Sequence, residues 1–310
     1  MKIAAAALAL LAVPATAFAP ATQKVARANA LNSFSYGSET ELPPTGLSSP
    51  GPRPPVSSGP PAFSGVGSRL GRSMWETLEP VTVQGGGALR TWSFQDPSVR
   101  RVQVLLRTEG RPLNANIDLW QGPDNTPHRM GIYIEDGNVR PFCCVIDTPK
   151  DNNAIAIRNT GQMEFPMEAC VEADLDDSLE AVTKSIANPE KLQGGAIRTY
   201  SFSPSVESVK ILLRTDGRPL NARIELLQGP NNNKQVIELY TEDGMERPFF
   251  AVVETPGVGN VVRVINTAPV EFPMISGVEP FLVKPGGRGD ETLVISDDGS
   301  AWGSRSLLDR

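Results

Sequence analysis

The sequence predicts an all-β protein with two tandem homologous antiparallel β-sandwich domains. Three observations support this: a long internal duplication, short alternating segments within each copy, and turn-forming residues between them. The duplication is the strongest. Residues 105–115, Leu-Leu-Arg-Thr-Glu-Gly-Arg-Pro-Leu-Asn-Ala, return as residues 212–222 with one change, and the shift of 107 positions holds without a gap for about sixty residues. A match of this length indicates two copies of one structural unit.

The duplication extends beyond this segment. Upstream, Arg-Thr-Trp-Ser-Phe at 90–94 matches Arg-Thr-Tyr-Ser-Phe at 198–202 after a one-residue adjustment. Two similar units in one chain can offer related surfaces on opposite sides, so we expect an approximate two-fold axis within the monomer. The downstream matches are 121–123 with 228–230, 135–137 with 242–244, 140–142 with 247–249, 148–149 with 255–256, and 164–167 with 271–274.

Each copy contains several short segments with the composition and two-residue alternation of β-strands. Turn formers such as Glu109-Gly110 and Asp136-Gly137 separate them. Short strands packed into about 85 to 95 residues favour an antiparallel sandwich over a parallel α/β sheet, and the strand order stays open. The strands expected in the first copy are 91–94, 102–106, 115–120, 132–134, 142–146, 154–157 and 163–165.

The remaining residues divide into targeting, connecting and tail segments. A short helix is expected over 175–187, because acidic residues precede it and Asn188-Pro189 ends it. The expected organisation is a signal peptide at 1–17, a plastid transit-like segment at 18–38, a Pro/Gly/Ser-rich arm at 39–74, repeat 1 at 75–170, a linker at 171–190, repeat 2 at 191–279 and a C-terminal tail at 280–310.

The N-terminus has the pattern of a targeting sequence. Lys2 precedes an apolar run from Ile3 to Val13, which is too short for a permanent membrane span. Residues 18–38 contain no Asp or Glu, as in transit peptides. The junction Thr16–Pro20 resembles the two-part plastid targeting sequences of diatoms and related algae, which implies import into the plastid; simple secretion is the alternative. The Pro-rich arm is expected to be extended or disordered.

Composition argues against several classes of protein. A net charge of −6 argues against a nucleic-acid surface. One His and three Cys, two of them adjacent, leave no ordinary zinc site, and the Cys are expected to be reduced. No other cofactor motif is present, and we expect no cofactor, no metal and no membrane span in the mature chain.

The reactive residues do not form a repeated set. His128 corresponds to Gln235, and we expect a surface residue in a turn rather than a general base. Cys143 and Cys144 correspond to Phe250 and Ala251, which indicates apolar core or near-core positions. The paired acids at 135–136 and 242–243 precede Gly, and a turn is favoured over acid–base chemistry or calcium binding.

The repeated polar residues are better candidates for contacts. Arginine provides a planar fork that suits carboxylates, and acids occur at equivalent places in both copies. Three interpretations stay open: ties within each sandwich, contacts between domains or subunits, and a glycan-binding loop. The candidate inter-domain or inter-subunit contacts are Arg107, Arg111, Asn114, Arg214, Arg218, Asn221 and Trp302.

Trp302 belongs to the tail, which contains apolar fragments at 281–284 and 292–296 among Gly, Asp and Ser. A free segment of this kind gains little by folding alone. It is expected to add a strand to an exposed sheet edge, of its own chain or of a neighbour, with Trp302 as an anchor. A disordered end is the alternative.

The plastid signal at Phe18-Ala19-Pro20, the Pro-rich arm and the two copies with Leu-Leu-Arg-Thr-x-Gly-Arg-Pro-Leu-Asn-Ala and Glu-Phe-Pro-Met together resemble the pyrenoid shell proteins of diatoms (PyShell). The resemblance covers about residues 75–285. It implies a non-enzymatic structural protein of the plastid stroma at the pyrenoid periphery. The family polymerises with itself into a thin sheet around the Rubisco matrix and supports CO2 concentration and fixation.

Two other classes of function are weighed beside this one. A soluble plastid β-sandwich module that binds polysaccharide or a protein partner would carry an exposed aromatic platform. Trp92 is matched by Tyr200 but Trp120 by Leu227, so only one of these aromatic positions is kept. A hydrolase is the weakest alternative, since no His, Cys or acid pair repeats as a catalytic set.

Overall fold

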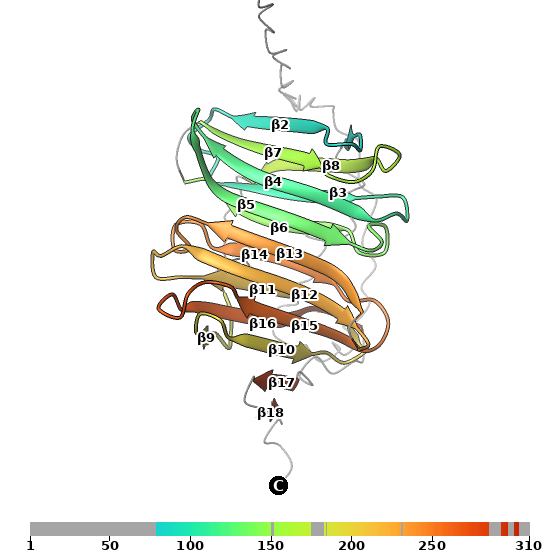
Figure 1. The fold of residues 1–310 in the computed structure, drawn as a ribbon, viewed down its shortest axis with the longest axis vertical. Coiled ribbons are helices and arrows are strands. Elements are labelled where there is room, and N and C mark those ends of the chain that lie inside the picture. Colours follow the sequence, from blue (N-terminus) through green and yellow to red (C-terminus); the bar gives the residue numbers. More distant parts are fainter. Residues whose placement is uncertain are drawn as a thin grey trace, which may run out of the picture. The chain divides into compact units, whose positions relative to one another are not determined.

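A computed structural model of the chain describes residues 79–149, 152–174, 183, 185–230, 232–284, 293–296 and 301–303. All of them lie in one compact unit, residues 59–310. The predicted signal peptide, the transit-like segment, the Pro-rich arm and most of the predicted helix over 175–187 lie outside the described residues. The elements of the described part are all β-strands (Figure 1).

The first repeat contributes strands β1 to β8, the second β9 to β16, and the tail β17 and β18. The bounds in the first repeat are β1 Val81–Val83, β2 Leu89–Phe94, β3 Arg101–Arg107, β4 Leu113–Gln121, β5 Asn125–Ile134, β6 Phe142–Asp147, β7 Asn153–Asn159 and β8 Met167–Asp174. The second repeat has β9 Glu190–Leu192, β10 Ile197–Ser201, β11 Val206–Arg214, β12 Leu220–Gln228, β13 Asn233–Thr241, β14 Phe249–Glu254, β15 Asn260–Asn266 and β16 Met274–Val283. The tail strands are β17 Leu293–Ser296 and β18 Ala301–Gly303.

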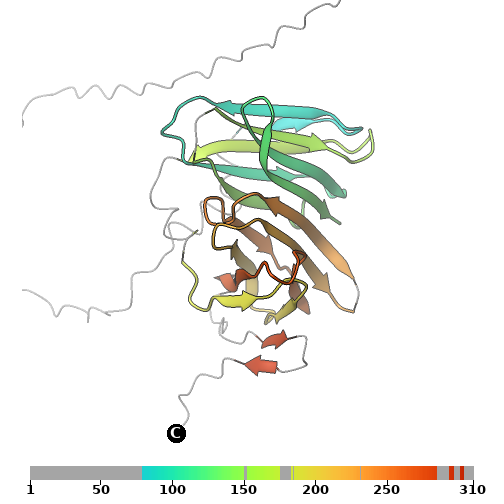
Figure 2. The ribbon, with the colours of Figure 1, turned by 60° about the vertical axis from the view of Figure 1, so that its left-hand side comes forward.

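These strands form two antiparallel sheets that face each other (Figure 2). The eight-stranded sheet has the order β1-β8-β3-β6-β14-β11-β16-β9, and the ten-stranded sheet has the order β18-β17-β10-β15-β12-β13-β5-β4-β7-β2. The predicted antiparallel sandwich architecture is confirmed. The two repeats nevertheless share their sheets, because β6 pairs with β14 and β5 pairs with β13 across the junction.

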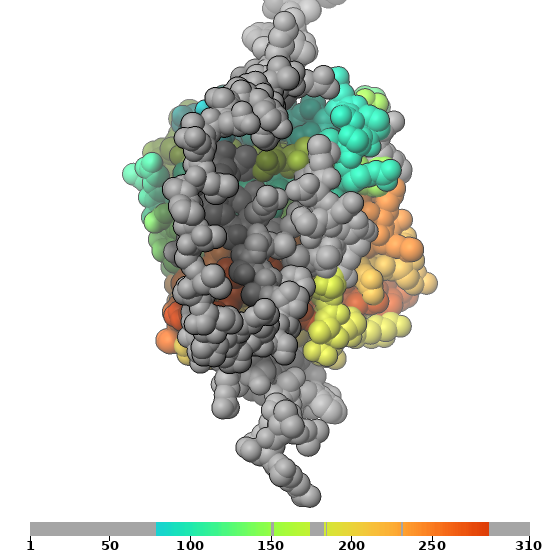
Figure 3. Space-filling view, turned by 180° about the vertical axis from the view of Figure 1, so that it is seen from behind, coloured from blue at the N-terminus to red at the C-terminus, as the bar shows by residue number. Residues whose placement is uncertain are grey.

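At the centre of both sheets, equivalent residues of the two repeats pair with each other. Gly131 on β5 faces Glu238 on β13, and 238 − 131 is the duplication shift of 107. Cys144 on β6 faces Ala251 on β14 with the same shift, 251 − 144. Antiparallel strands that pair a residue with its own equivalent are related by a two-fold axis through that pair. The expected approximate two-fold relation therefore passes through both central pairs, and Figure 3 shows the first repeat (blue to green) and the second (yellow to red) towards opposite ends.

The core lies between the sheets and follows from the alternation within each strand. On β4, Leu113, Ala115, Ile117 and Leu119 are buried, and the residues between them are more exposed. Successive side chains of a strand point to opposite faces, so this pattern places one apolar row against the other sheet. The same rows on the other strands join into one core that spans both repeats.

Six of the seven strands predicted in the first repeat are confirmed within β2 to β7. The strand predicted over 163–165 is wrong, because Phe165 N–H closes a turn on the Gln162 carbonyl at 3.0 Å. Pro166 has no N–H to donate to a ladder, so the strand begins only at Met167, which faces Val83.

Candidate assembly surfaces

The repeated Arg-Thr-x-Gly-Arg-Pro segment forms the loop that carries the chain from β3 in one sheet to β4 in the other. Thr108 Oγ1 donates to the Arg111 carbonyl at 2.5 Å, and Gly137 N–H donates to the same carbonyl at 3.1 Å. A Cβ at position 137 would lie 2.5 Å from Thr108 Oγ1, so only glycine fits there. The equivalent residues Thr215 and Gly244 make the same contacts in the second repeat.

The side chains of Arg111 and Arg218 lie against loops of their own repeats. Arg111 Nη1 donates to the Glu164 carbonyl at 3.4 Å, with its guanidinium 5.4 Å from the centre of the Phe165 ring. Arg218 donates to the equivalent carbonyl at 2.6 Å and lies 5.7 Å from the Phe272 ring. These contacts support the interpretation in which the arginines hold loops within each sandwich. A contact between subunits stays a prediction.

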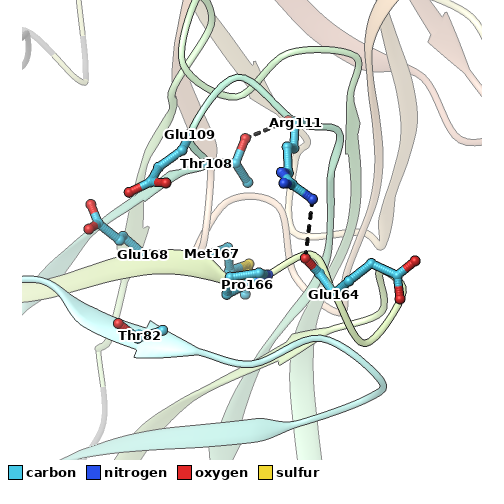
Figure 4. A pocket seen from close by; sticks show the side chains of 8 residues that line it. All are labelled: Thr82, Thr108, Glu109, Arg111, Glu164, Pro166, Met167 and Glu168. Atoms are coloured by element: carbon cyan, nitrogen blue, oxygen red, sulfur yellow. Dashed lines mark hydrogen bonds between the residues drawn. The ribbon is translucent and has the colours of Figure 1, made fainter.

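A small pocket lies beside Arg111 (Figure 4), with a volume of about 210 Å³. Three glutamates line it, but the Arg111 guanidinium points to a backbone carbonyl rather than to a shared centre (Figure 4). Small-molecule sites usually exceed about 300 Å³. Within the described ranges, no group of His, Cys, Asp or Glu is placed to hold a metal ion. The lining residues are Thr82, Thr108, Glu109, Arg111, Glu164, Pro166, Met167 and Glu168.

Among the other predicted contact residues, Arg107 and its equivalent Arg214 have different neighbours. Arg107 Nε pairs with Glu168 across β3 and β8 at 2.5 Å. Its equivalent Arg214 is exposed and faces Ile275, because the second repeat has isoleucine in place of the acid. Asn114 and Asn221 are half-buried. A role for these residues in contacts between subunits stays a prediction.

The tail adds a strand to its own sheet, as expected. On β17, Ile295 faces Thr199 and Val294 faces Tyr200 of β10. Trp302 lies on β18 and faces Val294 in the backbone register, so β17 and β18 form a hairpin at the end of the ten-stranded sheet. The role of Trp302 as an anchor stays a prediction.

Two buried arginines that join the repeats were not predicted from the sequence. Arg140 Nη2 donates to Gln228 Oε1 at 3.0 Å, and Arg247 Nη2 donates to Gln121 Oε1 at 3.0 Å. Each bond crosses from one repeat to the other, and both arginines are buried. The Arg-Pro-Phe and Gln-Gly-Pro matches were visible in the sequence, but nothing local shows that they meet across a two-fold axis.

The loop between β5 and β6 places Arg140. Asp136 Oδ1 accepts the N–H groups of Asn138 and Val139 at 2.9 and 3.1 Å, and the Asp136 carbonyl accepts Arg140 N–H at 3.0 Å. The predicted Asp-Gly turn is thus confirmed. It connects two sheets rather than two neighbouring strands, and it directs the arginine towards the other repeat.

His128 lies beside this junction, and the prediction of a surface histidine is wrong. Strand β5 already begins at Asn125, and His128 alternates in step with Met130 and Ile132 on the core side. Burial, with a smaller contribution from the charge of Arg247, lowers the pKa of His128 to about 3. A neutral, enclosed imidazole of this kind is a structural group, not a base open to a substrate.

The three cysteines are free, and Cys143 and Cys144 are buried, as predicted; Cys170 is buried as well. Burial raises the pKa of Cys143 to about 12 and that of Cys170 to about 11, and it also raises the pKa of Cys144. Since the thiolate is the reactive form, these residues do not supply a nucleophile at neutral pH.

The outer face of the eight-stranded sheet is apolar over the junction. On β6, Cys143 and Val145 alternate with core residues and so lie on this outer face. Ile186 of the linker and Phe281 at the end of β16 pack against the cluster that they form. Its other buried members are Leu105, Cys170, Leu212, Phe250 and Val252.

The outer face of the ten-stranded sheet is polar and carries two equivalent tyrosines. Tyr133 and Tyr240 are each 39% exposed, on the two strands that meet at the junction. Nearby, Arg223 Nη1 pairs with Glu238 at 2.7 Å. Exposed tyrosines within a polar surface are typical of protein contact regions, so this face is a candidate surface for assembly.

Another candidate surface is formed by the edges of the sheets. Both edge strands of the eight-stranded sheet, β1 and β9, have only three residues. In the ten-stranded sheet, β2 has six residues and pairs, among the described strands, only with β7. Short edges limit pairing with other chains, whereas a longer edge without proline invites it.

None of the described residues forms a helix that is long and apolar enough to cross a membrane. A search of curated proteins gives no match to this chain. A family model of the diatom pyrenoid shell proteins matches residues 75–280, well over half of the 310 residues. The matched range begins before β1 and ends within β16, so it covers the strands that join the two repeats but not the tail strands β17 and β18. The chain therefore belongs to the diatom pyrenoid shell protein family.

Proposed function

We propose that this protein is a structural, non-enzymatic subunit that assembles with copies of itself into the sheet-like shell around the Rubisco-containing pyrenoid. The shell would lie in the plastid stroma at the pyrenoid periphery and support CO2 concentration and fixation. Family membership gives the general role. The observation that carries self-assembly is the ten-stranded sheet, which runs through both repeats and ends in edge strands at opposite ends.

The symmetry of the chain fits a lattice. A closed oligomer uses up its contact surfaces, whereas contacts at opposite ends of a subunit propagate without closing. The two-fold axis between the repeats gives related surfaces at the two ends, and two unlike outer faces lie between them. Such a subunit can alternate its orientation in a layer and keep the layer nearly flat. One outer face is then free for contact with the Rubisco matrix.

The chemistry of the described residues supports a structural role over a catalytic one. The buried thiols have raised pKa values, His128 is enclosed with a pKa of about 3, and the pocket beside Arg111 is small. A shell slows the escape of CO2 because it is continuous. Continuity depends on contacts between subunits, and no catalytic group is needed for it.

Electron microscopy of the purified chain without residues 1–38 tests the proposal. We expect sheets or tubes in negative stain, and a fluorescent rim around the pyrenoid when the full chain is tagged in the native alga. A strict monomer at high concentration across a range of salt, together with diffuse stromal fluorescence, would contradict the proposal. A glycan array tests the alternative of a polysaccharide-binding module, for which no hits are expected.

A further inference from the structure

The two ends of the ten-stranded sheet differ although the repeats are related by symmetry. β2 and β10 are equivalent strands, with Arg-Thr-Trp-Ser in one and Arg-Thr-Tyr-Ser in the other. Their inner pairing is also equivalent: Arg90 faces Ile157, and Arg198 faces Val264, which is 107 positions later. The outer edge of β10 is covered by the tail strand β17, and the outer edge of β2 has no strand among the described residues.

The backbone of β2 presents hydrogen-bonding groups on this open edge. Asn159 N–H donates to the Ala88 carbonyl at 3.0 Å. Hydrogen-bonded pairs alternate along antiparallel strands, so Arg90 and Trp92 direct their N–H and C=O groups to β7, and Thr91 directs its own outward. At the other end, the equivalent Thr199 faces Ile295 of β17. The β2 edge therefore has the same outward N–H and C=O groups with which β10 binds the tail strand.

The tail hairpin has an open edge as well. β17 lies between β10 and β18 and is paired on both sides, whereas β18 is paired only with β17 among the described strands. The open edges of the ten-stranded sheet are thus those of β18 and β2, and they lie at its two opposite ends. Neither strand contains proline or lysine, the residues that commonly protect edges.

We propose that β18 of one copy pairs with the free edge of β2 in a second copy, so that the two ten-stranded sheets join end to end. The order across the contact is β10, β17, β18, then β2 and β7 of the second copy. Each copy keeps its own hairpin on β10, so the contact adds a strand pair without undoing one. Since the two edges lie at opposite ends, the contact does not close and forms a row of subunits. This inference rests on the proposed self-assembly and names the contact that drives one direction of it.

A proline in the β2 edge tests the acceptor side. Thr91→Pro removes an outward N–H and keeps the bonds to β7, so we expect an unchanged circular dichroism spectrum and at least about a tenfold loss of pelletable assembly. The matched control is Thr91→Val, which keeps the N–H and should assemble like the wild type. Assembly of Thr91→Pro at the wild-type level would overturn the inference.

A truncation after Ser296 tests the donor side, since it removes β18 and keeps β17. This variant should also fail to form rows. A mixture of it with Thr91→Pro contains one intact β2 edge and one intact β18 edge, so light scattering should show a 1:1 complex that does not grow. No complex in the mixture, or extended assemblies of either variant alone, would count against the proposed pair.

A photo-cross-linking amino acid at position 302, in an equal mixture of ¹⁵N-labelled and unlabelled chains, identifies the partner strand directly. Cross-links to residues 89–94 of the other isotope form are expected. Cross-links only within one chain, or cross-links to β2 from position 294 instead, would overturn the assignment to β18. Failure of the wild type to assemble would contradict the proposed function, whereas assembly of both variants would contradict only this contact.

Discussion

Several contacts in the loops and at the junction are the same in the two repeats, whereas the ends of the ten-stranded sheet differ. Thr148 and Thr255, for example, each donate through Oγ1 to the carbonyl of an equivalent valine, Val99 and Val206, both at 3.0 Å. In contrast, the edge strand β10 is covered by β17, and β2 is open among the described strands. The contacts kept in both copies are those on which each half depends for its fold. The difference in edge covering lies at the ends of the ten-stranded sheet, where a copy can meet another chain.

Arg247→Ala should cause the largest change, a loss of about 3 kcal/mol in the free energy of unfolding. It removes a buried cation from the junction and leaves Gln121 without this donor. Urea unfolding followed by tryptophan fluorescence measures the loss. The symmetry predicts a comparable loss for Arg140→Ala, and a change within about 0.5 kcal/mol for either variant would show that the junction does not depend on these bonds.

His128→Gln places in the first repeat the residue that the second repeat has at position 235. The folded pKa of His128, about 3, lies below its usual value of 6.5, so the unfolded chain binds more protons between these values. The wild type should therefore lose stability as the pH falls through this window, by about 2 kcal/mol at pH 5 relative to pH 7.5.

Unfolding curves at both pH values, for the wild type and His128→Gln, isolate this contribution from that of the carboxylates. The variant should be less sensitive to acid by the stated amount. Equal acid sensitivity of the two proteins would mean that His128 is protonated in the folded state.

Gly277→Ala tests the docking of the linker on the second repeat. Position 277 corresponds to Cys170, and an added Cβ would lie 2.0 Å from Ile186 Cδ1. We expect a loss of about 1 kcal/mol, because the linker must move away from the sheet. The double variant Gly277→Ala/Ile186→Ala should be no less stable than Ile186→Ala alone, and full additivity would argue against the contact.

The smallest difference is expected for the arginines at the ends of β3 and β11. Arg107→Ala removes a partly exposed ion pair with Glu168 and should cost about 0.5 kcal/mol at low salt, less at high salt. Arg214→Ala, at the position that faces Ile275, should leave the unfolding midpoint unchanged. Equal losses would show that the two arginines act through packing of their stems.

Local patterns in the sequence predicted most strands, the duplication, the buried thiols and the strand added by the tail. Ile295 can pair with Thr199 because β10 is the last strand of the second repeat in its sheet and leaves one edge open to the tail. The sharing of the sheets could not be predicted, because a β-strand has the same alternation at a domain edge and inside a continuous sheet.

The wrong prediction for His128 and the missed junction bonds have the same origin, because both depend on contacts between residues far apart in the sequence. His128 follows a Gly-Pro turn and a proline, which resembles a loop, but it faces Thr241 in the other repeat. Likewise, the partner of Arg247 is Gln121, 126 residues away. The candidate contacts Arg111 and Arg218 were found because they repeat, yet repetition alone does not separate a loop tie from an interface. The contacts with Phe165 and Phe272 support a loop tie, and a contact between subunits stays a prediction.

The self-pairing of Gly131 with Glu238 and of Cys144 with Ala251 is the geometry of a homodimer whose two halves have become one polypeptide. A homodimer of single repeats has identical ends, so a mutation that caps one end also caps the other. Once the halves are covalently fused, each can diverge on its own. One end can then gain an added strand while the other keeps an open edge. Gene fusion thus supplies the polarity that a directional row of subunits needs.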